Sequence, residues 1–261
     1  MRYVEVDLGE NLEEAVIVPI GDMHIGAPLF DRELADEVIG FIKKTPNAFA
    51  VVVGDIINAA TKNSVSDIYS EVMTPQEAKK LAIKLLKPIG DRILAVVPGN
   101  HEKRVWKESG SDIVEDVAMI LGIENRYDPA GVLLQIKFGQ YRNRGKLRYT
   151  MYLTHGTGGG RTSGSKINVL KRASDIVLAD VYVIGHVHAP LFTSDVIHVP
   201  AANGKIVEFK RFYVSTASFL KWGEYAEEKM LAPSAAVFPK IVLSGKERRV
   251  DVWAGQSLLP R

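Results

Sequence analysis

The strongest constraint in this sequence is that short apolar runs stop abruptly at polar residues. Residues 15–20, 50–53 and 93–97 are three such runs, and each predicts a buried β-strand because it is short, apolar and bounded by turn-forming residues. Two later runs, ending at residues 154 and 184, stop in the same way. Glycine beside each polar group lets the backbone turn sharply there. The polar residues that follow the five runs are Asp22 and His24; Asp55; Asn100, His101 and Glu102; His155; and His186 and His188.

Helical patterns lie between these runs, so the chain is expected to have an α/β architecture. Residues 31–44 carry apolar side chains on one helical face, and residues 74–77 (TPQE) form a capping box with Pro at the first helical position. Ser111 is expected to cap a further helix that runs to Gly122, and residues 165–174 predict another. Residues 132–138 and 147–154 read as hairpin partners.

The polar residues at the strand ends are expected to converge, because open α/β sheets bind ligands outside the carboxyl ends of their strands. The histidines support this expectation. The chain has six, and five of them follow the apolar runs, whereas His198 lies in an ordinary strand pattern and is expected to be structural or exposed.

The donor set predicts a pair of metal ions. The chain has no cysteine, which excludes disulfides, thiolate zinc sites and cysteine nucleophiles. Carboxylate, amide and imidazole donors suit Mn, Fe, Co, Ni or Zn. Seven donors are too many for one tetrahedral ion. They fit two ions that share one carboxylate, an arrangement suited to in-line displacement at phosphorus. The seven are Asp22, His24, Asp55, Asn100, His155, His186 and His188.

Charge and hydropathy bear on the partners of the protein and on its location in the cell. The net charge of +2 is too small to indicate nucleic-acid binding by itself. No run approaches the ~20 apolar residues of a membrane span, and the N-terminus lacks the pattern of a secretory signal. We therefore expect a cytoplasmic protein with no membrane partner, and a homo-oligomer is left open.

Taken together, the five polar groups and their order resemble the calcineurin-like metallophosphoesterase superfamily over about residues 15–190. The resemblance implies a four-layer αββα sandwich of two mixed β-sheets flanked by helices. It also implies a single domain over residues 1–261, in which the strand-rich C-terminal part completes the second sheet.

The resemblance further implies a role for each polar residue. The first metal would be held by Asp22, His24 and His188, the second by Asn100, His155 and His186, and Asp55 would bridge both. A hydroxide between the metals would be the nucleophile. His101 would donate a proton to the leaving oxygen, and Glu102 would orient His101. We expect Mn²⁺, with Fe, Zn, Ni or Co as alternatives.

One departure from the family bears on the substrate. Protein phosphatases of this superfamily continue the second polar group as GDxxDRG, whose Arg binds the phosphate, whereas residues 54–60 here read GDIINAA. Arg104 and Arg161 are candidate replacements. The leading hypothesis is a phosphodiesterase acting on DNA, RNA or a nucleotide. Two alternatives stay open: a phosphomonoesterase acting on a small metabolite, and a catalytically silent scaffold of the same fold.

Overall fold

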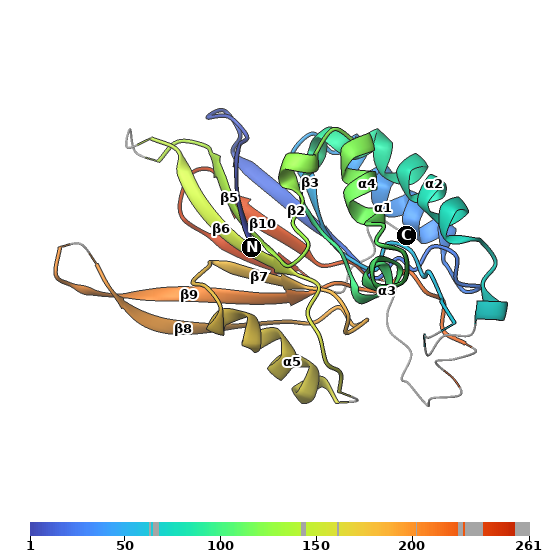
Figure 1. Ribbon diagram of the computed structural model, residues 1–261. Helices are drawn as coiled ribbons and strands as arrows, with labels where there is room; N and C mark the ends of the chain where they lie inside the picture. Colours follow the sequence, from blue (N-terminus) through green and yellow to red (C-terminus); the bar gives the residue numbers. More distant parts are fainter. Residues whose placement is uncertain are drawn as a thin grey trace.

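Two mixed β-sheets lie face to face at the centre of the chain (Figure 1), as seen in a computed structural model. The structure describes residues 1–62, 64, 68–141, 145–160, 162–201, 203–223, 227 and 237–253. Over these residues, the five-stranded sheet has the order β11-β10-β2-β3-β4 and the six-stranded sheet the order β1-β5-β6-β7-β9-β8. The strands are β1 (Arg2–Asp7), β2 (Glu14–Ile20), β3 (Ala48–Val53), β4 (Ile93–Val97), β5 (Val132–Phe138), β6 (Leu147–Thr154), β7 (Val181–Ile184), β8 (Phe192–Pro200), β9 (Ile206–Ser215), β10 (Lys240–Ser244) and β11 (Val250–Trp253).

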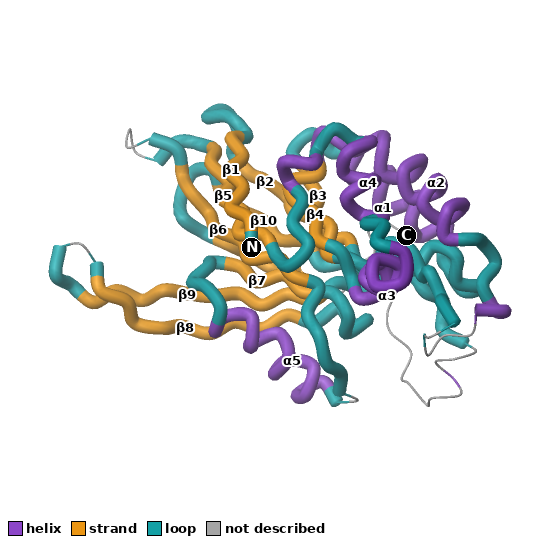
Figure 2. Tube along the Cα trace, viewed as in Figure 1, coloured by secondary structure: helices purple, strands orange, loops and turns teal. Residues whose placement is uncertain are grey.

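Helices cover the outer faces of both sheets, which completes the expected αββα sandwich (Figure 2). Three of them, α1 (Arg32–Lys44), α2 (Pro75–Leu86) and α4 (Ile113–Ile120), pack on the five-stranded sheet. The six-stranded sheet is covered by α5 (Ser163–Lys171). A further helix, α3 (Asn100–Ser109), begins directly beyond the end of β4. Short 3₁₀ segments are η1 (Ile68–Ser70), η2 (Lys87–Arg92), η3 (Glu124–Arg126) and η4 (Arg172–Asp175).

The side chains of β2 contribute to two separate parts of the hydrophobic core. Successive side chains of a strand point to opposite faces of the sheet. Ala15 and Ile17 are therefore buried in the core between the two sheets, whereas Val16 and Val18 are buried against the helices. Because both faces are covered, the strand is apolar from residue 15 to residue 20, which is why it was recognisable as a short continuous run.

Side-chain caps mark the starts of α1, α2 and α4. Asp31 caps α1 by accepting the backbone N–H of Leu34, and Thr74 forms the expected capping box with Glu77. The expected cap at Ser111 is wrong by one residue. Asp112 caps α4 instead, because its carboxylate accepts the N–H groups of both Val114 and Glu115.

The first strand and the last two strands of the chain lie in different sheets. The expectation that the C-terminal strands complete the second sheet holds for β8 and β9. It is wrong for β10 and β11, because β10 pairs antiparallel with β2 in the five-stranded sheet. In return, the N-terminal strand β1 pairs with β5 at the edge of the six-stranded sheet.

The described helices are too short and too polar to cross a membrane. The longest, α1, has 13 residues, against the roughly 20 apolar residues that a bilayer requires.

Candidate metal centre

The candidate site lies where strands of both sheets end beside α3 (Figure 1). The five-stranded sheet contributes the residues that come after β2, β3 and β4, and the six-stranded sheet those that come after β6 and β7. Direct contacts join the two sets: the Nδ1 atom of His155 lies 2.7 Å from the carbonyl oxygen of Val53. The expected convergence of polar residues at the strand ends is therefore present.

The seven candidate ligands form two groups that share Asp55. In the first group, Asp22, His24, Asp55 and His188 each offer one ligand atom, and in the second Asp55, His155 and His186 do so. Within each group these atoms lie within 4.8 Å of one another.

The amide oxygen of Asn100 completes the second group. It lies 3.0 Å from Nε2 of His155 and 2.8 Å from Nδ1 of His186. The groups therefore correspond to the two ligand sets that the family resemblance implies. The role of each residue as a ligand stays a prediction.

The carboxylate of Asp55 is the observation that best fits a metal. Its Oδ1 accepts the backbone N–H of His101 in the first turn of α3, where the helix dipole favours negative charge. Its Oδ2 is fully buried and has no hydrogen-bond partner among the described residues. The Nε2 atoms of His155, His101 and His24 lie 3.2, 3.7 and 3.9 Å from that oxygen. A buried carboxylate oxygen without a donor is costly, and a shared cation would satisfy it.

Backbone strain is concentrated at the same residues. Asp22, His24, Asp55, His186 and His188 all have positive φ angles, between 49° and 68°. This left-handed conformation is uncommon for residues other than glycine and costs about 1–3 kcal/mol each, so such residues tend to cluster at functional sites. These five residues follow closely on the ends of β2, β3 and β7.

The loss of a proton from His24 and from Asp55 also favours metal binding. Burial, followed by the neighbouring His101 and His188, lowers the pKa of His24 to about 3, which leaves its imidazole neutral as a ligand must be. Burial opposes ionisation of Asp55, but the adjoining His155 outweighs it and lowers the pKa of this carboxyl. Conversely, burial favours neutral His155, but Asp55 raises the pKa of His155 to about 9.

Glu102 does not contact His101 in the way that the sequence led us to expect. Its buried carboxylate accepts three backbone N–H groups, from Gly99 at 2.8 Å, Asp55 at 3.1 Å and Ile57 at 3.0 Å. It therefore braces the turn that presents Asp55. Burial and the charge of Asp55 raise the pKa of Glu102 to about 7.

The group that orients His101 is a backbone carbonyl. Nδ1 of His101 lies 2.6 Å from the carbonyl oxygen of Asn58, and Nε2 lies 3.0 Å from Nη2 of Arg104. The other terminal nitrogen of Arg104, Nη1, is buried without a hydrogen-bond partner among the described residues. Arg161, the second candidate for substrate binding, lies outside the described residues. His198 is exposed on β8.

Two residues beside the ligands were missed in the sequence. The hydroxyl of Thr216, just after β9, donates to Oδ2 of Asp22 at 2.6 Å, and Oδ1 of Asn58 lies 3.1 Å from Nδ1 of His24. Thr216 and Asp22 are 194 positions apart, so no local pattern could join them. Asn58 carried a signal, since it lies only three residues after Asp55.

Comparison with solved structures finds distant likenesses. One is a conserved uncharacterized protein, described as a predicted phosphoesterase, from Streptococcus pneumoniae TIGR4 (11% identity, TM-score 0.38, 94% of this chain and 99% of that one). Another is a Vps29 double mutant from Entamoeba histolytica (9%, 0.40, 92% and 99%). A third is GAP50, the anchor in the inner membrane complex of Plasmodium (12%, 0.43, 93% and 84%). No curated protein matches the chain.

The sequence itself, rather than these structural likenesses, identifies the family. The model of the calcineurin-like phosphoesterase family matches residues 15–194, which is more than half of the chain and contains all seven candidate ligands and His101. Of the site residues described above, Thr216 alone lies beyond the match. The chain therefore belongs to the calcineurin-like phosphoesterase family.

Proposed function

We propose that this protein hydrolyses phosphodiester bonds with the help of two divalent metal ions, and that its substrate is a nucleic acid or a nucleotide. The family supports hydrolysis of a phosphoric ester. The observation that carries the proposal is the unpartnered Oδ2 of Asp55, which is surrounded by imidazole nitrogens.

The residues present fit two metal ions. Asp22, His24 and His188 would hold one and Asn100, His155 and His186 the other, while Asp55 would contact both. Oxygen and imidazole donors suit Mn²⁺, which we propose as the metal. Two bound dications would lower the pKa of water and neutralise charge on the phosphoryl oxygens.

His101 is proposed to protonate the leaving oxygen. Its Nδ1 is held by the Asn58 carbonyl, so its Nε2 is the atom left to face a substrate. That nitrogen lies 3.7 Å from Oδ2 of Asp55, close to both groups of ligands. Arg104 now lies against Nε2, and its buried Nη1 is a free donor among the described residues. A bound phosphate would provide the acceptor that Nη1 lacks, and we propose that Arg104 binds it.

The preference for diesters rests on the three residues at positions 58–60, shortly after Asp55. Asn58, Ala59 and Ala60 stand where the related protein phosphatases carry an Asp-Arg-Gly sequence, so the arginine that binds a terminal phosphate is missing there. A diester carries one negative charge fewer at phosphorus than a monoester and demands fewer cationic contacts.

Lysines near the starts of β6 and β9 lie too far from this site to guide a nucleic acid into it. Lys146, directly before β6, lies at the opposite end of that eight-residue strand from His155, ~26 Å away at 3.3 Å per residue. Moreover, Lys137 and Lys146 pair with Glu5 and Asp7 of β1. Lys205 likewise precedes the ten residues of β9, whose far end adjoins the site, and so lies ~33 Å away. A nucleic-acid substrate would therefore have to be bound by residues around α3.

A panel of rates with Mn²⁺ tests the proposal, each measured beside an EDTA control. The substrates are bis-p-nitrophenyl phosphate, p-nitrophenyl phosphate, single-stranded DNA and a cyclic nucleotide. We expect EDTA to abolish turnover and the generic diester to be cleaved faster than the monoester. Faster cleavage of the monoester would reject the diester preference, and no turnover of any substrate would reject the enzymatic function.

A further inference from the structure

We propose that Asn58 is a positioning residue that holds the metal ligand His24 through its side chain and the proton donor His101 through its backbone, and that Glu71 sets the orientation of the Asn58 amide. This inference rests on the proposed function, because it assigns partners to two residues of that site. Asn58 stands at the position of the second Asp in the GDxxDRG sequence of the related protein phosphatases, whereas Glu71 lies in none of the motifs described above.

The first contact defines which nitrogen of His24 faces the metal site. Nε2 of His24 lies 3.1 Å from Nε2 of His188 and 3.9 Å from Oδ2 of Asp55, within the first group of candidate ligands. Nδ1 points the other way and lies 3.1 Å from Oδ1 of Asn58. A ligand nitrogen must carry no proton, so Nδ1 has to carry it and donate to Asn58. An acceptor at Nδ1 therefore keeps Nε2 available for the metal.

The second contact decides which way the Asn58 amide faces. An amide side chain can donate through Nδ2 or accept through Oδ1, and either atom could face His24. Nδ2 of Asn58 donates to the carboxylate of Glu71, which can only accept when ionised. Because the amide nitrogen is held by Glu71, the amide oxygen is left for His24.

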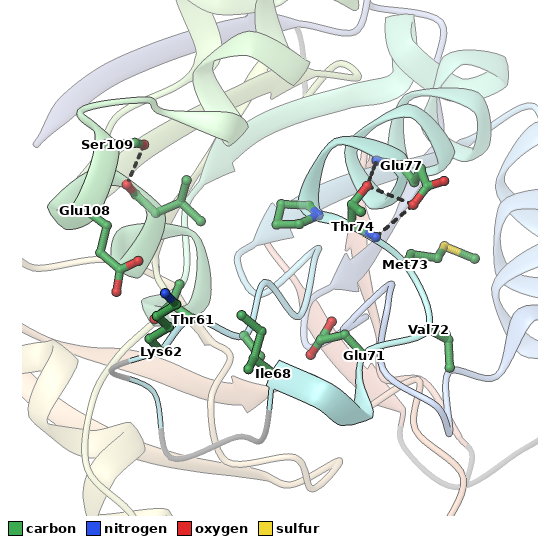
Figure 3. Close-up of a pocket in the computed structure, with 13 residues that line it drawn as sticks. Thr61, Lys62, Ile68, Glu71, Val72, Met73, Thr74, Glu77, Glu108 and Ser109 are labelled. Atoms are coloured by element: carbon green, nitrogen blue, oxygen red, sulfur yellow. Dashed lines mark hydrogen bonds between the residues drawn. The ribbon is translucent and has the colours of Figure 1, made fainter.

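Glu71 is well placed for this role because it is partly buried and lies outside the ligand groups. It lines a cavity of about 830 Å³ between the segment before α2 and the face of α3 that carries Val105 and Ser109 (Figure 3). The chain of contacts thus runs from the cavity wall through Glu71 and Asn58 to His24.

The third contact, between Asn58 and His101, is independent of the other two because it is made by the backbone. The carbonyl oxygen of Asn58 lies 2.6 Å from Nδ1 of His101, and this contact does not involve the Asn58 side chain. Replacing the side chain therefore removes the partner of His24 while leaving that of His101.

The Asn58→Ala variant uses this separation. We expect the affinity for Mn²⁺, measured by isothermal titration calorimetry, to fall about 10- to 100-fold at one of two sites, as when the outer partner of a ligand is lost. In the metal-free protein, ¹⁵N NMR should show that His24 loses its preference for the proton at Nδ1. Saturating Mn²⁺ should restore most of kcat, because His101 keeps its backbone acceptor. Asn125→Ala, at an exposed position in η3, is the matched control and should change none of these readouts.

Exchanging the two polar groups tests Glu71. Asn58→Asp places a carboxylate against Glu71 and should weaken Mn²⁺ binding. In the Asn58→Asp/Glu71→Gln double variant, the new amide can donate to the new carboxylate, which still accepts from His24. We expect the double variant to recover most of the affinity, and this exchange also serves if Asn58→Ala does not fold.

Each result decides a separate point. If the wild-type protein binds two Mn²⁺ ions and both Asn58→Ala and Asn58→Asp bind them equally well with an unchanged His24 tautomer, the positioning role is wrong and the proposed function stands. If the double variant binds no better than Asn58→Asp, the role of Glu71 is wrong. A wild-type protein that binds no Mn²⁺ overturns the proposed function and the ligand role of His24 with it.

Discussion

At the scale of single residues, replacing His101 tests the proton-transfer role apart from metal binding. It lies beside both groups of candidate ligands, but it is not a member of either. We expect His101→Ala to lower kcat for a diester by about 10²- to 10⁴-fold, the usual contribution of a general acid. The metal content of the purified variant, measured by elemental analysis, should match that of the wild type. Unchanged turnover would remove the role assigned to His101.

Gly99 is required by a close approach rather than by an unusual φ angle. A Cβ atom added there would lie 2.0 Å from Oδ1 of Asp55 and 2.3 Å from its backbone nitrogen. Gly99→Ala must therefore displace Asp55 or the start of α3. We expect loss of Mn²⁺ binding in calorimetry together with a lower Tm. The control is Gly164→Ala in α5, where a Cβ would meet nothing within 4 Å. Wild-type Mn²⁺ affinity in Gly99→Ala would contradict the tight fit.

The residues of the site were predictable to the extent that they come directly after strands. Asp22, Asp55 and His155 could be found because each comes after a buried apolar run, and parallel strands bring such residues together. Their supporting contacts could not be found this way. The carboxylate of Glu102 binds the backbone N–H groups of Asp55 and Ile57, more than forty positions away, and backbone donors leave no mark in a sequence.

At the scale of elements, Asp195 of β8 links this strand to β9 and to helix α5. It lies on β8 opposite Arg211 of β9, whose guanidinium donates to both carboxylate oxygens at 2.8 and 3.1 Å, and Lys171 of α5 lies 3.5 Å away. Burial alone would raise the pKa of Asp195, but the hydrogen bond from Arg211 outweighs it and lowers that pKa.

This shift predicts how stability depends on pH. Because the pKa of Asp195 is lower in the folded chain, its contribution is complete above the unfolded value of about 3.9 and is lost as the pH falls through the folded value. Asp195→Asn should reduce the free energy of unfolding by about 1–2 kcal/mol at pH 7 in urea titrations, and by less near pH 2.5, which lies below the unfolded pKa. The control, Asp36→Asn, removes an exposed pair with Arg32 on α1 and should cost little at either pH. An equal loss at both pH values for Asp195→Asn would reject this account.

A helix or strand could be predicted from the sequence where both of its faces are buried, or where one face is buried at a regular spacing. The bounds of β5 and β6 and the end of β7 agree with the apolar patterns, since these strands lie inside the sandwich. In contrast, β1 was missed because it lies at a sheet edge and only Val4 of its six residues is buried. Likewise, α3 was missed because it has no apolar stripe; Glu102 is its only buried residue.

At the scale of the whole molecule, the candidate site joins the two sheets. The first group of ligands takes Asp22, His24 and Asp55 from one sheet and His188 from the other. Bound metal should therefore resist separation of the sheets as well as support catalysis. An ion at 100 times its dissociation constant stabilises the folded state by about 2.7 kcal/mol. For a chain of this size that corresponds to a rise in Tm of about 5–10 °C.

Thermal melts with excess Mn²⁺ and with EDTA measure this effect. We expect Mn²⁺ to raise the Tm of the wild type, and Asp55→Asn to lose the rise because the shared ligand is weakened. The same melts with Asp36→Asn should keep the full rise. A wild-type Tm that does not respond to Mn²⁺ would contradict a metal site between the sheets.

The position of β10 has a consequence for how the chain is made. Within the described residues, β2 lies between β3 and β10, and β2 leads directly into Asp22 and His24. A ribosome delivers β2 more than two hundred residues before β10, so a nascent chain presents one open edge of β2 while the residues between the two strands are made. Closure of the five-stranded sheet must therefore wait until residues 240–244 have left the exit tunnel.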